Sequence, residues 1–269
     1  MTEQRQPTPE EVWRGLLLGT DPRLASKARL FKHIPGGSHR CKMCRAPFGF
    51  PGGLLMRRIK RGPWAKNPRY CEFCSKALEA FRGGAEIPAS FLFADIRGST
   101  TLAERMSATE FHRLLNLFYE VASGILVAHD GVVDKFVGDE VVALFIPALA
   151  GDNHAARAVA AGQELLEGTR ATAHRPAIPI GIGIHSGVAY IGSVGEPPIT
   201  DFTALGDAVN VTARLASAAG AGELLISREA ATAAGFDATG LESRSLELKG
   251  KSAPVDVLVL GRREGQPVA

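Results

Sequence analysis

Four cysteines in two C-x2-C pairs are the first residues of this sequence whose spacing indicates a chemical function. Cys41 and Cys44 form one pair, and Cys71 and Cys74 form the other after an interval of 26 residues. Two such pairs around a loop are typical of a tetrathiolate metal site rather than of a disulfide framework. We expect structural zinc, with an iron–sulfur or rubredoxin-like iron centre and a metal-free thiol switch as alternatives.

Two aspartates, Asp95 and Asp139, form a second candidate site. Asp95 comes at the end of a compact apolar run over 89–96, which we predict to be a strand, and Asp139 lies between two further β-rich runs. If these strands are neighbours, the two carboxylates meet at one edge of a sheet. Such a pair suits two hard divalent cations, which prefer carboxylate and phosphate oxygens.

The elements that must position these aspartates alternate between strands and helices from residue 86 onward. Capping-box signals at Thr101 and Ser107 predict helices, and the apolar spacing from Phe111 predicts a buried helix face. We then predict, in chain order, a hairpin of 132–137 and 141–145 joined through 138–140, a helix over 152–167, a strand pair over 178–186 and 188–194, a helix over 206–219, a strand over 223–226, a helix over 228–234, and strands over 244–249 and 255–260. This order is similar to a ferredoxin-like α+β sandwich.

The chain before residue 86 has a different pattern. Thr8 and Glu11 form a capping box that predicts a short helix, whereas 34–68 is rich in Gly, Pro and Arg and indicates loops that need a metal to hold them together. Gly83-Gly84 suggests a hinge. We therefore expect a helical segment over 1–33, a cysteine-rich module over 34–82 and an α+β domain over 86–262.

Charge divides the chain in the same way. Residues 38–76 contain ten Lys or Arg and one acid, a balance of +9, whereas the remainder holds 21 basic and 27 acidic residues, a balance of −6. The basic module suits nucleic acid, or docking against the acidic domain, and we favour the docking or regulatory role. The longest apolar run, 141–150, is too short to span a membrane, so we expect a cytoplasmic protein and no membrane association.

Four segments of the α+β domain together resemble the class III nucleotidyl cyclase catalytic domain, and they occur in the order that this family shows. They are FLFADIRGS from Phe91, VDKFVGDE from Val133, GIGIHSG from Gly181 and FTALGDAVNVTAR from Phe202. The resemblance covers about 86–260. It implies a ferredoxin-like cyclase fold and a dimeric enzyme that converts a nucleoside triphosphate to its 3′,5′-cyclic monophosphate and pyrophosphate.

The resemblance also assigns roles to single residues. Asp95, Ile96 and Asp139 match the positions that hold two Mg or Mn ions in the family. Asn210 matches the residue that positions the ribose, and Arg214, one helical turn later, matches the residue that meets charge developing at the α-phosphoryl group. His185 lies on an apolar strand, and we predict it to be a hydrogen-bonded core residue rather than a catalytic base.

Three further positions match family residues that bind the nucleotide. Lys135 corresponds to a base-selecting lysine, which can donate to N1 of adenine but faces a competing donor at N1 of guanine. Thr203 occupies its partner position and can accept from the adenine amino group, although many members carry Asp there. Lys249 corresponds to the lysine that holds the terminal phosphates. The combination of Lys and Thr is similar to a bacterial adenylyl cyclase subclass.

The resemblance implies a homodimer as well. In the family, the metal-binding carboxylates of one protomer complete a site with the nucleotide-binding residues of the other, so a two-fold dimer has two sites. We therefore expect an adenylyl cyclase that acts on ATP. The alternative from another class is a catalytically silent regulator that binds nucleotide, or binds nucleic acid through its basic module.

Overall fold

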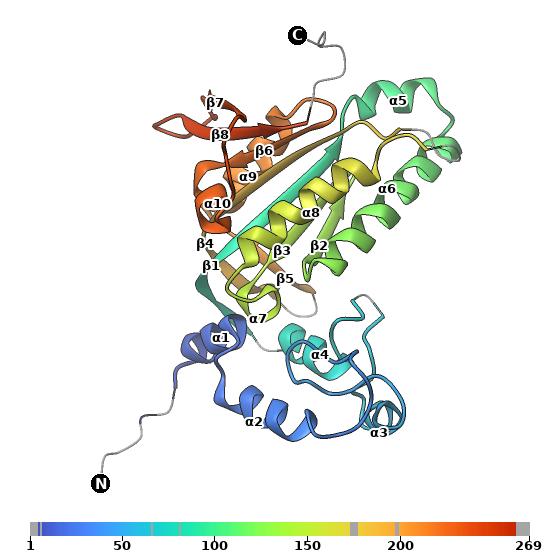
Figure 1. The fold of residues 1–269 in the computed structure, drawn as a ribbon, viewed down its shortest axis with the longest axis vertical. Helices are drawn as coiled ribbons and strands as arrows, with labels where there is room; N and C mark the ends of the chain where they lie inside the picture. Colours follow the sequence, from blue (N-terminus) through green and yellow to red (C-terminus); the bar gives the residue numbers. More distant parts are fainter. Residues whose placement is uncertain are drawn as a thin grey trace. The chain divides into compact units, whose positions relative to one another are not determined.

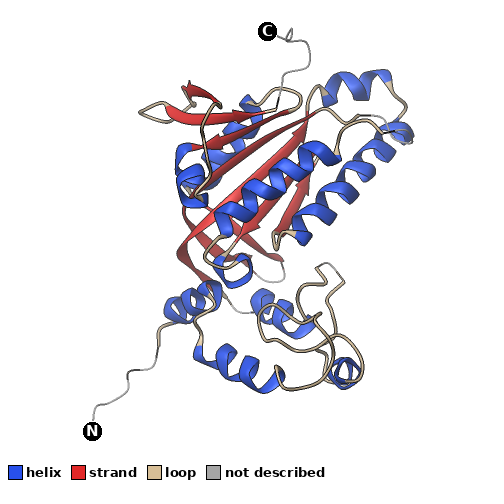
Figure 2. Ribbon diagram, in the orientation of Figure 1, coloured by secondary structure: helices blue, strands red, loops and turns tan. Residues whose placement is uncertain are grey.

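The computed structural model describes residues 5, 7–65, 67–80, 82–172, 177–196 and 199–261. Its chain divides into two compact units. The first comprises Met1–Ile87, Ile146–Gly151 and Val188–Leu205, and the second comprises Pro88–Phe145, Asp152–Gly187 and Gly206–Ala269. Figure 1 labels the elements along the chain, and Figure 2 distinguishes helices from strands. The three-part division that the sequence suggests stays a prediction.

Eight strands form one mixed sheet in the described part of the chain, in the order β2-β3-β1-β4-β6-β8-β7, with β5 paired to β4. The strands are β1 (Gly83–Ile96), β2 (Val132–Val137), β3 (Glu140–Phe145), β4 (Ile180–Glu196), β5 (Ile199–Leu205), β6 (Glu223–Ser227), β7 (Glu242–Leu246) and β8 (Val255–Leu260). β4 and β6 are parallel, whereas the β1–β3, β2–β3, β4–β5, β6–β8 and β7–β8 pairs are antiparallel. The neighbours β2-β3-β1-β4 form the ferredoxin-like core, which confirms the predicted α+β class.

Helices cover both faces of this sheet in the second unit. The helices of this unit are α5 (Ser99–Arg105), α6 (Ala108–Ala128), α8 (His154–Gly168), α9 (Asp207–Ala218) and α10 (Arg228–Ala234), of which α5 contacts α6 and has no buried residue. Successive residues of β4 show the two layers, because a Cβ at Gly183 would lie 2.3 Å from the Ala216 backbone nitrogen in α9, whereas the side chain of Ile184 contacts Gly162 in α8. α6 lies beside α8 (Figure 1).

The long helix α6 illustrates how local sequence sets these elements. Ser107 Oγ accepts from the Glu110 backbone nitrogen at 3.3 Å, and Glu110 Oε2 accepts from the Ser107 nitrogen at 2.8 Å, so a complete capping box begins the helix. Phe118, Ala122 and Leu126 follow at intervals of four residues and are fully buried. None of the helices in the described residues combines the length and apolar composition needed to cross a membrane.

The first unit holds short helices and the cysteine loops. Its helices are α1 (Pro9–Leu18), α2 (Pro22–Phe31), α3 (Gly52–Arg58), α4 (Glu72–Ala80) and α7 (Pro147–Ala150). Thr8 and Glu11 form the predicted capping box of α1. Trp13 of this helix is buried, donates from Nε1 to the Arg82 carbonyl at 3.1 Å and stacks on Phe202 of β5, with ring centroids 6.2 Å apart. Trp13 therefore anchors α1 within its unit.

Four sequence-based expectations were wrong. The capping box predicted at Thr101 does not form, because α5 begins at Ser99 after Gly98 and has no side-chain cap. The predicted strand pair over 178–186 and 188–194 is one strand, β4, which passes through Gly187 without a turn and pairs with β5. Gly83-Gly84 belongs to β1 rather than to a hinge, and a Cβ at Gly84 would lie 2.5 Å from the Ile191 carbonyl oxygen, so this glycine allows a close strand approach. The stretch predicted as loops includes the helix α3.

Candidate active site and cysteine cluster

The structure brings the three proposed metal-binding residues together at one edge of the sheet. Asp95 ends β1 and is paired with Glu140 of β3, and Asp139 occupies the tight turn between β2 and β3. The Ile96 backbone nitrogen donates to the Asp139 carbonyl at 3.2 Å. Antiparallel pairing of β1 with the hairpin thus places both aspartates side by side, as the sequence interpretation required.

The charge around Asp95 and Asp139 is concentrated and partly buried. The Asp95 side chain is 16% exposed, and its Oδ1 accepts no hydrogen bond from the described residues, although it contacts Arg97 Nη2. Burial raises the pKa of Glu140, and the neighbouring Asp139 carboxylate raises it further, while Arg97 opposes both effects. The carboxylates of Asp95, Asp139 and Glu140, which lie on neighbouring strand ends, are a donor set that suits Mg or Mn.

Arg97 was not identified as a site residue from the sequence. Its Nη1 donates to the Ser217 carbonyl at 2.9 Å and more weakly to the Ala219 carbonyl at 3.4 Å, both at the end of α9, while Nη2 contacts Asp95. Burial lowers the pKa of Arg97, and Asp139 and Glu140 oppose that shift. One guanidinium therefore links the carboxylate edge to the helix that carries Asn210 and Arg214.

Tyr119 of α6 is a second residue that sequence reasoning missed. Its hydroxyl donates to the Gly138 carbonyl, one residue before Asp139, and its ring lies 4.3 Å from the ring of Phe136. Burial, followed by the Asp139 carboxylate, raises the pKa of Tyr119. The only sequence signal was that Tyr119 follows Phe118 on a helix with a regular apolar face. Tyr119 holds the turn that presents Asp139.

Lys135 lies on β2, on the same hairpin as Asp139. The β2–β3 register shifts between Val133 and Lys135, so Asp134 is the extra residue of a β-bulge. The Asp134 side chain is 2% exposed, and its Oδ2 lies 3.6 Å from Lys135 Nζ. The Lys135 side chain is 38% exposed. Thr203, on β5 opposite Gly192, is buried and belongs to the first unit.

The remaining predicted residues lie around α9. Asn210 is exposed and Arg214 is half-buried one turn later on the same helix. The Arg214 guanidinium lies against Gly250, because a Cβ at Gly250 would be 3.4 Å from Arg214 Nη2, and the exposed Lys249 precedes that glycine. The structure therefore brings Arg214 close to the β7–β8 loop that carries Lys249.

His185 of β4 is buried, and its Nδ1 lies 2.8 Å from Ser227 Oγ, which confirms the prediction of a hydrogen-bonded core residue. Burial lowers the pKa of His185, and nearby Lys251 adds to the shift, while Glu229 and Asp207 oppose it. Lys251 Nζ in turn donates to Asp207 Oδ2 at 2.7 Å. Burial thus favours the neutral form of His185 in the folded protein.

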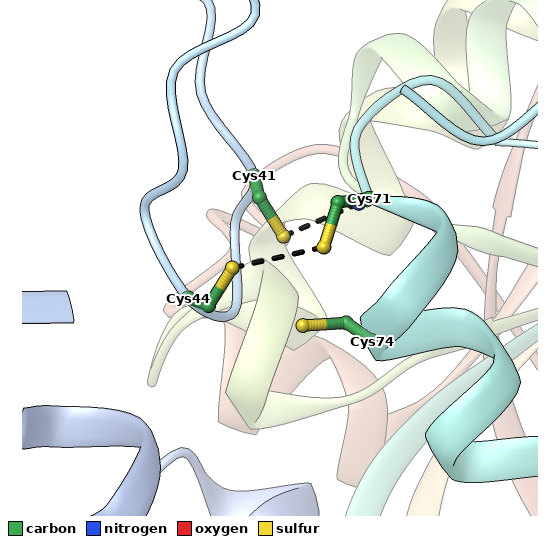
Figure 3. A group of neighbouring side chains, drawn as sticks. All are labelled: Cys41, Cys44, Cys71 and Cys74. Carbon is green, nitrogen blue, oxygen red and sulfur yellow. Dashed lines mark hydrogen bonds between the residues drawn. The ribbon is translucent and has the colours of Figure 1, made fainter. Parts of the chain in front are cut away.

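The four cysteines converge in the first unit, as Figure 3 shows. Their sulfur atoms lie within 4.8 Å of one another and are buried, with Cys44 Sγ 3.7 Å from Cys71 Sγ. The Cys71 backbone nitrogen donates to Cys41 Sγ at 3.3 Å, and Arg61 Nη1 donates to Cys44 Sγ at 3.5 Å. Such donors favour thiolates, so the cluster suits a metal ion.

Contacts among the four thiols shift their pKa values in opposite directions. Hydrogen bonds with neighbouring thiols, that of Cys41 foremost, lower the pKa of Cys44 and of Cys71. The same kind of contact, led by Cys44 for Cys41 and by Cys41 for Cys74, raises the pKa of those two thiols. Without a cation, four adjacent thiols cannot all be ionised.

Comparison with known proteins identifies the family. Residues 86–261 match the family model described as the adenylate and guanylate cyclase catalytic domain. Adenylate cyclase 1 of Rhizobium meliloti (strain 1021) is 35% identical over 130 residues, which are 46% of this chain and 20% of that protein. The adenylate cyclase of Anabaena cylindrica is 35% identical over 133 residues, 47% of this chain and 26% of that protein. The match thus spans only a fifth to about a quarter of these relatives.

Solved structures give the same result for the fold. The guanylyl cyclase Cya2 is 29% identical with a TM-score of 0.62, and the match covers 68% of this chain and 96% of that chain. The adenylyl cyclase CyaB from P. aeruginosa is 31% identical with a TM-score of 0.57, covering 68% of this chain and 99% of that chain. The similar structures include both nucleotide specificities, so the likeness alone does not select the base.

Proposed function

The chain belongs to the adenylate and guanylate cyclase catalytic-domain family, and from this membership we propose that it is an adenylyl cyclase that converts ATP to 3′,5′-cyclic AMP and pyrophosphate. The observation that carries the proposal is the convergence of Asp95, Ile96 and Asp139 at one sheet edge, joined by the hydrogen bond between the Ile96 nitrogen and the Asp139 carbonyl. This edge is a donor set for two divalent cations.

Each proposed residue has a defined chemical task. Asp95 and Asp139 would hold two Mg or Mn ions, which supply Lewis acidity and make the ribose 3′-hydroxyl more acidic. Asn210 orients the ribose so that the 3′-oxygen lies in line with the leaving pyrophosphate. The bond from this oxygen to the α-phosphorus forms as the bond to pyrophosphate breaks, and the hydroxyl proton leaves to solvent. Arg214 stabilises the charge that develops on the α-phosphoryl oxygens, and Lys249 holds the terminal phosphates.

The choice of ATP rests on Lys135 and Thr203. A lysine only donates hydrogen bonds, so Lys135 suits the N1 acceptor of adenine, and the Thr203 hydroxyl can accept from the adenine amino group. Lys135→Glu would replace the donor by an acceptor and should lower kcat/KM for ATP by about tenfold to a hundredfold. Lys32→Glu makes the same charge change at an exposed position outside the domain and should leave it unchanged. Identifying the product by mass from ATP and from GTP tests the base choice directly.

We also propose that active sites form between two copies of the chain, with the carboxylates of one protomer facing Asn210 and Arg214 of the other. Asp139→Ala and Arg214→Ala should each abolish turnover alone. When the two variants are coexpressed, half of the dimers are mixed and have one intact site of two, so roughly a quarter of wild-type activity should return. Failure of this rescue would contradict shared sites. A purified wild-type dimer inactive on ATP with Mn would instead favour a catalytically silent regulator.

For the cysteine cluster we propose one structural zinc ion. A tetrahedral site with Zn–S bonds of about 2.3 Å has sulfur–sulfur edges of about 3.8 Å, and Cys44 and Cys71 are 3.7 Å apart. An iron–sulfur cluster places several atoms between its ligands and needs a wider ring of sulfurs. Elemental analysis should give one zinc per chain. Stoichiometric iron with visible absorption would overturn the assignment.

A further inference from the structure

The cysteine-rich part of the chain carries an apolar stripe that faces solvent. Phe50 is 80% exposed, Leu54 61%, Leu55 54% and Ile59 48%. Leu54 and Leu55 are neighbours within α3, Phe50 lies just before this helix and Ile59 is its C-cap residue, so the four exposed side chains belong to one short segment. Scattered exposed apolar residues are ordinary on soluble proteins, but four within ten residues mark an interaction surface.

The opposite side of α3 shows why the stripe is fixed outward. Gly52, Gly53 and Met56 are buried, and Met56 belongs to the same core cluster as the four cysteines. A Cβ at Gly52 would lie 2.1 Å from the Pro35 carbonyl oxygen, and one at Gly53 would lie 2.2 Å from the Phe48 carbonyl oxygen. The two glycines therefore allow the helix to pack closely on the neighbouring loops with Met56 in the core, and this packing leaves Leu54 and Leu55 on the solvent side.

The charge around the stripe is of one sign. Between Asp21 and Glu72 the sequence has thirteen Lys and Arg and no acidic residue. Arg57, Arg58 and Lys60 are exposed on α3 and its C-terminal end, interleaved with the apolar stripe. In the same unit, a pocket of about 280 Å³ is lined by basic side chains and by no carboxylate among the described residues; they include His39, Arg40, Lys42, Arg45 and Arg69.

We propose that the α3 face, defined as Phe50, Leu54, Leu55, Arg57, Arg58, Ile59 and Lys60, binds the surface of an anionic phospholipid bilayer. The apolar side chains would enter the boundary between headgroups and acyl chains, and the cations would contact lipid phosphates. The combination of charge and apolar side chains favours such a surface over two other partners. Nucleic acid would pair with the cations, but leucine side chains cannot stack on its bases. A second copy of this face would repel it, because both faces are cationic. The composition predicted no membrane association, and the α3 face changes that to peripheral binding without a spanning helix.

The test is co-sedimentation of the full-length, metal-loaded chain with vesicles of phosphatidylcholine alone and of phosphatidylcholine mixed with phosphatidylglycerol. We expect binding to the mixed vesicles to exceed binding to the neutral ones at least tenfold. This binding should fall strongly at about 1 M salt, because the Debye length is then only about 3 Å. Leu54→Ser with Leu55→Ser, and separately Arg57→Gln with Arg58→Gln, should each weaken binding about tenfold or more.

Matched variants separate this surface from general effects. Val188→Ser removes an apolar side chain of similar exposure, and Arg105→Gln with Arg113→Gln removes two exposed charges from the other unit; both should bind like wild type. Zinc content and circular dichroism verify folding of every variant. Equal binding to both vesicle types, or full binding by the leucine variant, would overturn the proposal. Tighter binding to a DNA duplex, lost in the arginine variant but kept in the leucine variant, would overturn it in favour of nucleic acid.

Discussion

The two units of this chain have different kinds of core. In the second unit, strand residues such as Phe91–Ala94 are buried in a continuous sheet between helical layers. In the cysteine-rich part of the first unit, the buried core cluster is held under short helices and loops and consists of Phe31, Cys41, Cys44, Ala46, Met56, Cys71 and Cys74. The first core is maintained by hydrophobic burial, whereas the second has too little apolar surface and depends on its sulfur ligands.

This difference separates two roles. A sheet core can present charged groups at the ends of its strands and on its helices, because Asp95, Asp139 and Arg214 all extend from elements fixed by burial elsewhere. The cysteine core needs few buried residues, so most of the surrounding chain is at the surface. A run of basic and apolar residues can therefore face solvent. The comparison predicts that each half fails independently when its own core is damaged.

The largest effect should come from removing one cysteine ligand. Cys74→Ser leaves three thiolates, and structural zinc contributes on the order of 10 kcal/mol to such modules, so most of that stabilisation should be lost. Trypsin should then cleave rapidly within residues 22–71, while fragments of the sheet unit persist. Mass analysis of the digest and the zinc content measure this, and wild-type protein treated with a chelator should give the same pattern. Simultaneous loss of the sheet unit would break the comparison.

The reverse experiment damages the sheet. Gly183→Val would place a Cβ 2.3 Å from the Ala216 nitrogen and 2.7 Å from the Thr212 carbonyl, which pushes α9 away from β4. We expect a loss above about 4 kcal/mol in the unfolding free energy of this unit and no cyclase activity. Zinc should still bind at one ion per chain. Gly124→Ala, on α6 with open space around it, should stabilise by up to about 1 kcal/mol.

The sheet unit was largely predictable because its signals are local. Capping at Ser107 and period-four burial along α6 specify that helix, and the run through Gly138 and Asp139 specifies the β2–β3 hairpin. The strand pair predicted on the two sides of Gly187 is one strand in the structure. β4 continues through Gly187. A Cβ at this position would lie 3.0 Å from Ala208 Cβ in α9, so the glycine allows the strand and the helix to pack closely. Close packing, not a turn, explains the residue.

Glycines also occur in α3, where they allow close packing, and the candidate site depends on long-range contacts in a similar way. Gly52 and Gly53 suggested a loop, yet they begin a helix pressed against the carbonyls of Pro35 and Phe48. For the site, family-like motifs indicated Asp95 and Asp139, whereas Arg97 and Tyr119 act through long-range contacts. The partner carbonyls of Arg97 lie 120 residues or more away, a separation that periodicity and spacing do not encode.

A smaller effect tests electrostatics within the sheet unit. Glu223 is 1% exposed, and its carboxylate accepts two bonds from Arg244, at 2.9 Å and 3.2 Å. Those bonds, and then those with Glu242, raise the pKa of Arg244. Glu223→Gln should cost about 3 kcal/mol in chemical unfolding, because it leaves a partly buried guanidinium without its main carboxylate. Glu242→Gln removes the exposed partner of the same arginine and should cost less than about 1 kcal/mol. Equal costs would refute the distinction.

The smallest effect is a pH dependence confined to the sheet unit. Burial lowers the pKa of His185 below the value of about 6.5 that an unfolded chain has, so between these two values the unfolded state binds more protons and stability falls as pH falls. The slope contributed by this residue is at most about 1.4 kcal/mol per pH unit. His185→Asn should flatten the acid side of the stability curve, measured by amide exchange in β4 and β6, whereas His112→Asn on the exposed face of α6 should not. An unchanged slope in the His185 variant would mean that acid acts on this unit through other groups, of which His154, whose pKa burial also lowers, is the next to substitute.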